Sequence, residues 1–471
     1  MKFVFSIFFS MIVSQCCFAQ HWDSLNAHPN IPARIFYTDT IANKLYIGGT
    51  FTQVGSEYMG EISSWDGQRW DSLGHGLDDI SVGQRQVYAI TRLGGYLYAG
   101  GGFILAGNQW IAGLARWDGN TWDSVPGAAL AQNDGVLGLT AYNNELYISG
   151  IFNVIGGVPV GGIARWDGTT CHPIGNYNFL ANGGAIFRME FYNGNLYVSG
   201  HFDDPNGNQA ELAKWDGQNW QFFTNDIITT IGGVVDITVY DNKLFVAGCF
   251  FEQDGNAGTS IMTWNDTTWS GVGGSVQLGS INPYPFVRQM CVHNGKLYCI
   301  GSFEYVGGVS AKGLASWDGT QWCGYDALFT SAAYNFTGGN TIAFLNDTMY
   351  VGGNFMRIDS LMVPRIGKWI AGSYVDTCGA ITTGIDELGN PDQSVLVYPN
   401  PATFNVTFHI AGIDGNKTLI IYDQLGREIW KRETSDMEIT VPLTDFASGI
   451  YFYRVESESG MSARGKFIVK Q

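Results

Sequence analysis

The stretch Leu45-Tyr46-Ile47-Gly48-Gly49-Thr50-Phe51 decides the fold, because phrases of the form Leu-Tyr-x-Gly-Gly-x-Phe recur along the whole chain. The seven copies begin at Leu45, Leu97, Leu146, Leu196, Leu244, Leu297 and Met349. A second phrase, Trp-Asp-Gly-x-x-Trp, follows, with its first Trp at Trp65, Trp117, Trp166, Trp215, Trp264, Trp317 and Trp369. Self-similarity at a period of about 50 residues indicates a repeat architecture.

Each copy predicts four short strands. In the second copy these are residues 87–92, 97–103, 114–117 and 121–125, with glycine-containing turns between them. Four antiparallel strands in about 50 residues form one blade of a β-propeller. A lone blade cannot bury both faces, so neighbouring blades must pack against it. The sequence therefore predicts an all-β fold, with a seven-bladed β-propeller over residues 21–378.

The recurring Trp and Asp residues have structural and functional interpretations. We expect the first Trp of each phrase to wedge between blades, and a ligand-binding aromatic box is the alternative. We expect the Asp to form a turn, because Asp side chains bond nearby backbone N–H groups. A metal ligand is the alternative for this Asp.

The N-terminus predicts how the ring closes. Residues 22–25, Trp-Asp-Ser-Leu, copy residues 70–73, the outer strand of the first full repeat. The seventh copy lacks a complete Trp-Asp-Gly-x-x-Trp phrase. We expect the N-terminal strand to complete the last blade, although residues 374–377 could fill the same place. The di-glycine and the spaced aromatic residues resemble kelch-type propeller repeats, although the order of elements differs from the usual kelch pattern.

Composition and charge limit the classes of partner. The chain has 471 residues and a net charge of −17, which disfavours nucleic acid and anionic lipid. Residues 1–20 read as a signal peptide, with Lys2, an apolar core and a small-residue cleavage site. No other segment is long and apolar enough to span a membrane.

Export permits disulfides between the six cysteines that remain after residue 20. Cys291 and Cys299 flank a turn and are predicted to pair across a hairpin. Cys323 and Cys378 are a second candidate pair. Cysteines buried as small apolar residues are the alternative.

A new pattern of six or seven short strands follows a predicted linker, residues 379–393. Residues 394–471 therefore predict a small Ig-like β-sandwich. The phrases Tyr398-Pro399-Asn400-Pro401-Ala402, 422–428, 447–455 and 465–470 closely resemble the type A C-terminal sorting domain of the type IX secretion system of Bacteroidetes. The residues that carry this resemblance are Tyr398, Pro399, Asn400, Pro401, Gly426, Gly449, Tyr451 and Lys466.

The resemblance implies a partner and a destination. The signal peptide would carry the chain to the periplasm, and the type IX secretion machinery would move it across the outer membrane. Members of this family are commonly trimmed and then anchored to surface lipopolysaccharide or released. We therefore expect a secreted or outer-surface protein, acting as a monomer.

No catalytic or metal-binding constellation stands out in the sequence. The seven His residues are scattered without a shared motif, and no spacing singles out a pair of carboxylates. Two Asp-rich loops, residues 202–208 and 252–256, resemble calcium loops, but neither has the twelve-residue spacing with a terminal Glu, so polar turns are the simpler interpretation. We expect no cofactor, with calcium as the one that is left open. Candidate ligand-binding residues lie on the inner strands and inter-blade loops: Arg85, Arg188, Asp236, Arg288, Tyr284 and Tyr334.

These features favour a binding or adhesion propeller that recognises a glycan or a surface protein. The alternative is a propeller enzyme acting on polysaccharide, a lyase or a glycosidase. Whether the chain is an enzyme stays open, although a binding role is favoured.

Overall fold

The computed structural model describes residues 21–78, 86–224, 226–227, 233–277, 284–325, 327–331, 338–359, 361–370, 394–398, 402–411, 415–423, 427–457 and 462–470. The chain divides into two compact units, Met1–Gly379 and Ala380–Gln471. The predicted signal peptide and the predicted linker 379–393 lie outside the described residues.

The described part of the first unit contains seven four-stranded antiparallel sheets. The first four, each in order from its first strand, are β2(Ala33–Asp39), β3(Lys44–Gly49), β6(Ile62–Trp65), β7(Trp70–Asp71); β9(Val87–Leu93), β10(Tyr96–Gly101), β13(Leu114–Trp117), β14(Trp122–Ser124); β15(Gly135–Tyr142), β16(Glu145–Ile151), β19(Ile163–Trp166), β20(Cys171–Pro173); and β21(Ala185–Tyr192), β22(Asn195–Asp203), β23(Gln209–Trp215), β24(Trp220–Phe222). The other three are β25(Gly233–Tyr240), β26(Lys243–Cys249), β27(Ile261–Trp264), β28(Trp269–Gly271); β30(Phe286–His293), β31(Lys296–Ser302), β34(Leu314–Trp317), β35(Trp322–Gly324); and β37(Thr341–Leu345), β38(Thr348–Gly352), β41(Ile366–Ile370), β1(His21–Ser24). The loops that the structure describes contain two short 3₁₀ helices, η1(Ala181–Gly183) and η2(Glu252–Asp254).

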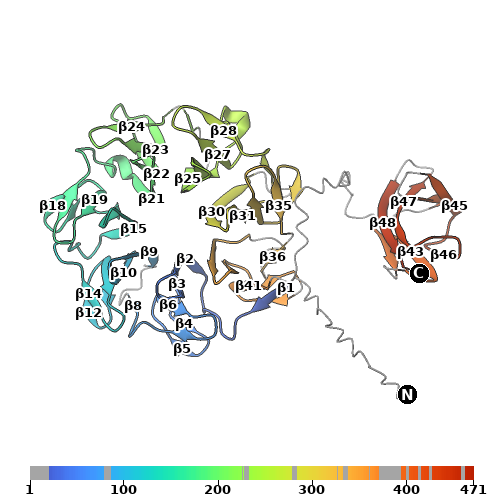
Figure 1. Cartoon of the computed structure of the whole chain (residues 1–471), viewed down its shortest axis with the longest axis horizontal. Coiled ribbons are helices and arrows are strands. Elements are labelled where there is room, and N and C mark those ends of the chain that lie inside the picture. The colour runs from blue at the N-terminus through green and yellow to red at the C-terminus, as the bar shows by residue number, and fades with distance from the viewer. Residues whose placement is uncertain are drawn as a thin grey trace, which may run out of the picture. The chain divides into compact units, whose positions relative to one another are not determined.

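The sheets stand around a ring with their first strands innermost (Figure 1). Each innermost strand contacts the innermost strand of the next sheet, and β37 contacts β2. This radial arrangement is that of a β-propeller.

Side chains of the innermost strands bond to the backbone of the neighbouring sheet. Thr140 donates its hydroxyl to the Met189 carbonyl at 2.9 Å, and the Phe36 N–H donates to Thr341 at 3.1 Å. The Ile342 N–H donates to the Gln289 amide oxygen at 2.9 Å. Because the partners belong to different sheets, these bonds fix the spacing of the ring.

The N-terminal strand completes the last sheet, as predicted. β1 pairs antiparallel with β41, and Trp22 lies opposite Trp369. Their rings are 5.0 Å apart, as Trp65 and Trp70 are 5.1 Å apart in the first sheet. Residues 374–377, the alternative, lie outside the described residues.

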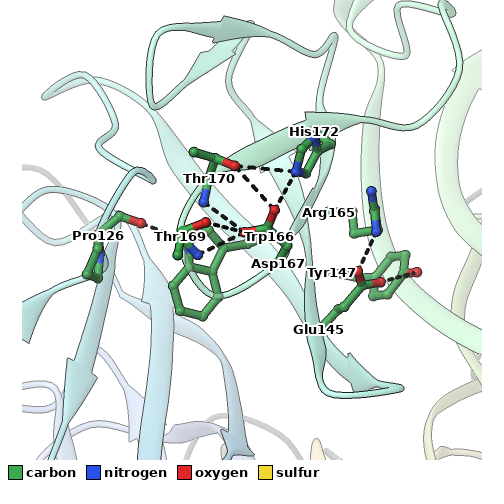
Figure 2. A network of polar contacts seen from close by, with 9 residues as sticks. All are labelled: Pro126, Glu145, Tyr147, Arg165, Trp166, Asp167, Thr169, Thr170 and His172. Carbon is green, nitrogen blue, oxygen red and sulfur yellow. Dashed lines mark hydrogen bonds and ion pairs between the residues drawn. The ribbon is translucent and has the colours of Figure 1, made fainter.

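The recurring Trp and Asp side chains serve packing and turns, and the third sheet illustrates both (Figure 2). Asp167 accepts backbone N–H bonds from Thr169 and Thr170, both at 2.9 Å, and His172 Nε2 lies 2.7 Å from its second oxygen. Trp166 donates its indole N–H to the carbonyl of Pro126, between sheets, at 2.7 Å. Bonding of this kind lowers the pKa of Asp167 well below its usual range, with the His172 contact the largest cause. The turn-forming and wedging interpretations are confirmed.

Short two-residue hairpins extend the sheets at one end of the ring. Among the described residues they join the second and third strands of five sheets: β4(Gln53–Val54) with β5(Glu57–Tyr58), β11(Leu105–Ala106) with β12(Gln109–Trp110), β17(Val154–Ile155) with β18(Val158–Pro159), β32(Tyr305–Val306) with β33(Val309–Ser310), and β39(Arg357–Ile358) with β40(Leu361–Met362). Three of them pair with a strand that precedes their own sheet: β8(Leu77–Asp78), β29(Val276–Gln277) and β36(Phe329–Thr330). These extra pairs therefore link one sheet to the next.

The predicted Cys291–Cys299 disulfide is wrong. Both cysteines are free, and the hairpin register places Cys291 opposite Tyr298 and Cys299 opposite Met290. Directly opposite residues share a sheet face while successive residues alternate, so the two thiols point to opposite faces. Cys323 is disulfide-bonded, and Cys378, its predicted partner, lies outside the described residues.

The second unit contains two sheets in its described part. One has the order β42(Ser394–Tyr398), β43(Asn405–Ala411), β46(Glu438–Pro442), and the other β45(Glu428–Thr434), β44(Lys417–Tyr422), β47(Gly449–Ser457), β48(Ser462–Val469). Buried residues from both sheets, including Phe408, Leu419, Val441 and Phe467, form one apolar cluster. The unit is a two-sheet sandwich with its own core.

Candidate functional site

In five of the seven repeat phrases, the second glycine lets the innermost strand come close to the second strand; these glycines are Gly101, Gly150, Gly200, Gly248 and Gly301. A Cβ on Gly248 would lie 2.0 Å from the carbonyl oxygen of Gly233. A Cβ on Gly301 would lie equally close, at 2.0 Å, to the carbonyl oxygen of Phe286. No side chain fits at these distances, so the position requires glycine for close backbone approach.

Beside this glycine, six of the seven innermost strands carry a β-bulge near their start. The pairing register skips one residue at each of these points. The skipped residues, called here the bulge residues, are Arg34, Tyr88, Leu137, Phe187, Val235 and Arg288. A bulge re-aims the side chain of the extra residue and is common beside binding sites.

The bulge residues turn away from the packing between sheets. Each is partly or fully exposed, whereas the residue before it is buried. Val87, Val136 and Val234, for example, are 0% exposed. Because a first strand begins where its antiparallel partner ends, the bulge residues lie at the hairpin end of the ring. Four of the six are apolar and two are arginines.

Asp236 and Arg188, two of the predicted site residues, are brought together by the fold. Asp236 is 6% exposed, and its Oδ1 lies 3.5 Å from Arg188 Nε of the preceding sheet. Its Oδ2 accepts the Met290 N–H of the following sheet at 2.7 Å. Burial raises the pKa of Asp236 to about 6, against the opposing effect of the Arg188 charge. Asp236 therefore links three neighbouring innermost strands.

Glu190 is a second carboxyl group at the same place, and the sequence did not single it out. It lies two residues from Arg188 on β21, and its Oε1 accepts a hydrogen bond from the Phe191 N–H at 3.0 Å. Burial raises the pKa of Glu190 to about 7, and the charge of Asp236 adds to this effect. The carboxyl groups of Glu190 and Asp236 therefore interact, and Asp236 also lies against Arg188.

Arg288 is the bulge residue of β30, and its guanidinium lies 4.8 Å above the Phe286 ring. Desolvation lowers the pKa of Arg288, and the positive charge of Arg34 lowers it further. Arg34 belongs to the same site, and it was not predicted. Arg34 Nε donates to the Gln86 amide oxygen at 2.9 Å.

Tyr284, four residues before Arg288, is 44% exposed at the surface. Its ring makes an edge contact with Phe251 at 6.0 Å. Arg85 and Tyr334 lie outside the described residues. The structure thus brings Arg188 and Asp236 together, and it places Arg288 and Tyr284 along one chain segment.

The Asp-rich loop after β22 is a polar turn. Asp204 Oδ1 accepts the backbone N–H groups of Asn206 and Asn208, each at 2.8 Å, and Asn208 Nδ2 donates to Oδ2 at 3.0 Å. Across the described residues, no group of three or more His, Cys, Asp or Glu side chains is arranged to hold a metal ion.

In the second unit, the described sorting-motif residues occupy packing and edge positions. Tyr451 donates its hydroxyl to the Ala447 carbonyl at 2.9 Å and packs on Phe446. Gly449 pairs with Val469, and Lys466 is exposed on β48. Tyr398 ends β42, and Pro399, Asn400, Pro401 and Gly426 lie outside the described residues.

Comparison with protein families identifies this second unit. Residues 396–470 match the family described as the secretion system C-terminal sorting domain. The tail is a type IX secretion sorting tail, and the chain is a secreted or cell-surface protein exported through the periplasm. In the described part of the chain, no helix has the length and apolar character needed to cross a membrane.

Comparison with solved structures gives low-identity matches. PorZ, an essential surface component of the type IX secretion system of Porphyromonas gingivalis, matches with a TM-score of 0.42 and 17% identity, over 91% of this chain and 58% of that one. The extracellular domain of a putative one-component system of B. thetaiotaomicron matches with a TM-score of 0.44 and 12% identity, over 95% and 59%. The Dos1 propeller matches with a TM-score of 0.37 and 10% identity, over 75% and 96%.

The chain thus spans less than two thirds of the length of PorZ and of the B. thetaiotaomicron protein. Comparison with curated protein sequences gives no match.

Proposed function

We propose that this exported protein is a binding or adhesion module. In this proposal, a seven-bladed, kelch-like propeller presents its ligand site at the hairpin end of the ring, where the bulge residues lie. The bulges carry this proposal. They turn six side chains out of the packing between sheets at corresponding positions around one axis. Side chains that stabilised the ring alone would point into that packing, as Val87 and Val136 do.

The proposal includes the arrangement of the whole chain. Residues 1–20 are the signal peptide, 21–378 the propeller, 379–393 a linker, and 394–471 an Ig-like sorting domain. The type IX secretion machinery is the partner during export. At the surface, the monomeric propeller binds a glycan or a surface protein.

A screen for binding without turnover tests this function. Residues 21–471 would be applied to an array of polysaccharides and outer-membrane glycoconjugates, with and without calcium, and any polysaccharide product would be assayed. Phe187→Ala and Tyr88→Ala should weaken binding to any ligand found. Ile41→Ala is the control, because Ile41 is 80% exposed in the turn between β2 and β3, at the opposite end of β2 from its bulge. Binding that survives both bulge substitutions would contradict the proposal.

A second candidate function, cleavage of polysaccharide, rests on Glu190. A carboxyl group with a pKa of about 7 is suited to donate a proton as a general acid. The carboxylate of its neighbour Asp236 forms an ion pair with Arg188 and accepts a hydrogen bond from the Met290 N–H, which favours a structural role for that carboxylate. Release of product from a polysaccharide, lost in Glu190→Gln, would replace the binding function with this one.

A further inference from the structure

Arg34 and Arg288 have no acidic partner among the described residues of the propeller. Arg365 also forms no ion pair there, but its Nη1 donates to the Pro29 carbonyl at 3.1 Å. Ion pairs with a carboxylate are made by Arg69, Arg92, Arg116, Arg165 and Arg188. The side chains of Arg34 and Arg288 are exposed, and neither forms an ion pair within the described ranges of the chain. In a protein with 42 acidic and 25 basic residues, unpaired guanidinium groups require an explanation.

The fold places the two arginines near each other. Both are bulge residues at the start of an innermost strand, Arg34 on β2 and Arg288 on β30. Only β37 separates these strands around the ring, and it contacts both of them. The positive charge of Arg34 lowers the pKa of Arg288, which agrees with this placement. Two like charges held together in this way form a natural site for an anion.

Both guanidinium groups are also held in position. Gln86 accepts the Arg34 Nε–H and donates its own N–H to Tyr88, the next bulge residue, at 2.7 Å. The Nη atoms of Arg34 make no hydrogen bond to another described residue. Arg288 lies over the Phe286 ring, a geometry that leaves the edge of its guanidinium group available.

We propose that Arg34 and Arg288 together bind a carboxylate or sulfate group of an acidic glycan, while the apolar bulge residues contact the sugar rings. This rests on the proposed function and names the ligand class for the same site. A planar guanidinium matches the two oxygens of such a group. The other bulge residues, Tyr88, Leu137, Phe187 and Val235, supply the apolar surface that sugar faces contact.

The test uses residues 21–471 with two acidic probes, polygalacturonate for carboxylate and dextran sulfate for sulfate, and neutral dextran for comparison. Binding is measured by titration calorimetry at low and physiological salt. Arg34→Gln and Arg288→Gln should each weaken binding of an acidic probe at least tenfold, and the double variant should abolish it. Arg69→Gln is the control, because it makes the same charge change on a side chain that is 85% exposed in an outer turn. It should change the affinity less than twofold.

Each result decides the inference. Equal weakening by Arg34→Gln and Arg69→Gln would show general charge attraction and would overturn the site. Binding of dextran alone would overturn the acidic ligand class and leave the binding function intact. If no probe binds and a polysaccharide is cleaved, the binding function and the site would both be rejected. If neither probe binds and neither is cleaved, the acidic-glycan site would be rejected.

Discussion

Gly248 is a residue at which a single added methyl group should disturb the ring. A Cβ there would lie 2.0 Å from the Gly233 carbonyl oxygen, which belongs to the same sheet and cannot move independently. We expect Gly248→Ala to lower the free energy of unfolding by about 1–3 kcal/mol, as overpacking does. Chemical denaturation measures this change. Gly95→Ala is the control, since nothing lies within 4 Å of its Cβ position, and a similar loss there would contradict the argument.

Glu190 should make stability depend on pH. Its ordinary pKa is 4.5 and its folded pKa is about 7. Between these values the unfolded chain releases the proton that the folded protein keeps, so wild-type stability falls as pH rises from 4.5 to 7. Glu190→Gln should gain stability relative to wild type across this window, by up to about 3 kcal/mol at 1.36 kcal/mol per pKa unit.

Denaturant titrations at several pH values would measure this gain. Glu57→Gln, which makes the same change on an exposed side chain, should follow the wild-type profile. Parallel profiles for Glu190→Gln and wild type would disprove the buried-proton account.

Individual site residues were predicted only in part. Five bulge residues, Arg288 among them, lie thirteen positions before the repeat glycine, but Arg34 lies fifteen before Gly49 because its hairpin turn is longer. Counting along the repeat therefore misses it. No sequence motif marked Glu190 as a site residue, because its raised pKa comes from burial that only the folded ring creates. The cysteine pairing failed because a shift of one residue in register reverses the sheet face.

Among the elements, β1 has the largest consequence for the ring. Trp22 is 5% exposed and packs on Trp369 at 5.0 Å and on Phe329 at 6.0 Å. We expect Trp22→Ala to destabilise the protein by about 3–5 kcal/mol and to speed amide exchange in β41. Hydrogen–deuterium exchange and chemical denaturation test both effects.

The matched control for this change is Trp110→Ala, which removes the same side chain from an exposed position. It should alter stability by less than about 0.5 kcal/mol. Unchanged amide exchange in β41 after Trp22→Ala would show that the pairing of β1 with β41 does not stabilise the last sheet.

The main strands were predictable as elements because each combines an alternating pattern with a glycine turn. The terminal strand was found because residues 22–25 repeat residues 70–73. The short hairpins such as β11 with β12 were read as loops. Two-residue strands carry no alternation, and their pairing depends on the neighbouring sheet, as β8 shows.

For the whole molecule, the sorting tail should determine the destination. Removal of residues 394–471 should leave the propeller in the periplasm of a host with a type IX secretion system, because the tail is the signal for transport across the outer membrane. Cell fractionation and surface labelling measure this. The full chain with Lys431→Ala, a change on the exposed strand β45, should still reach the surface. Surface labelling of the truncated chain would contradict this role of the tail.

The pairing of β1 with β41, which closes the ring, also determines how the propeller bears a mechanical load. β41 is the last strand of the first unit in the described part of the chain, and it lies between β38 and β1 in its sheet. A pull from the C-terminal side therefore acts on an interior strand with a ladder of hydrogen bonds on each side. The N-terminal strand β1 pairs along the other edge of β41 and so covers that strand. A propeller fixed to a cell through its C-terminal side would then resist shear from its ligand better than one closed by its last strand.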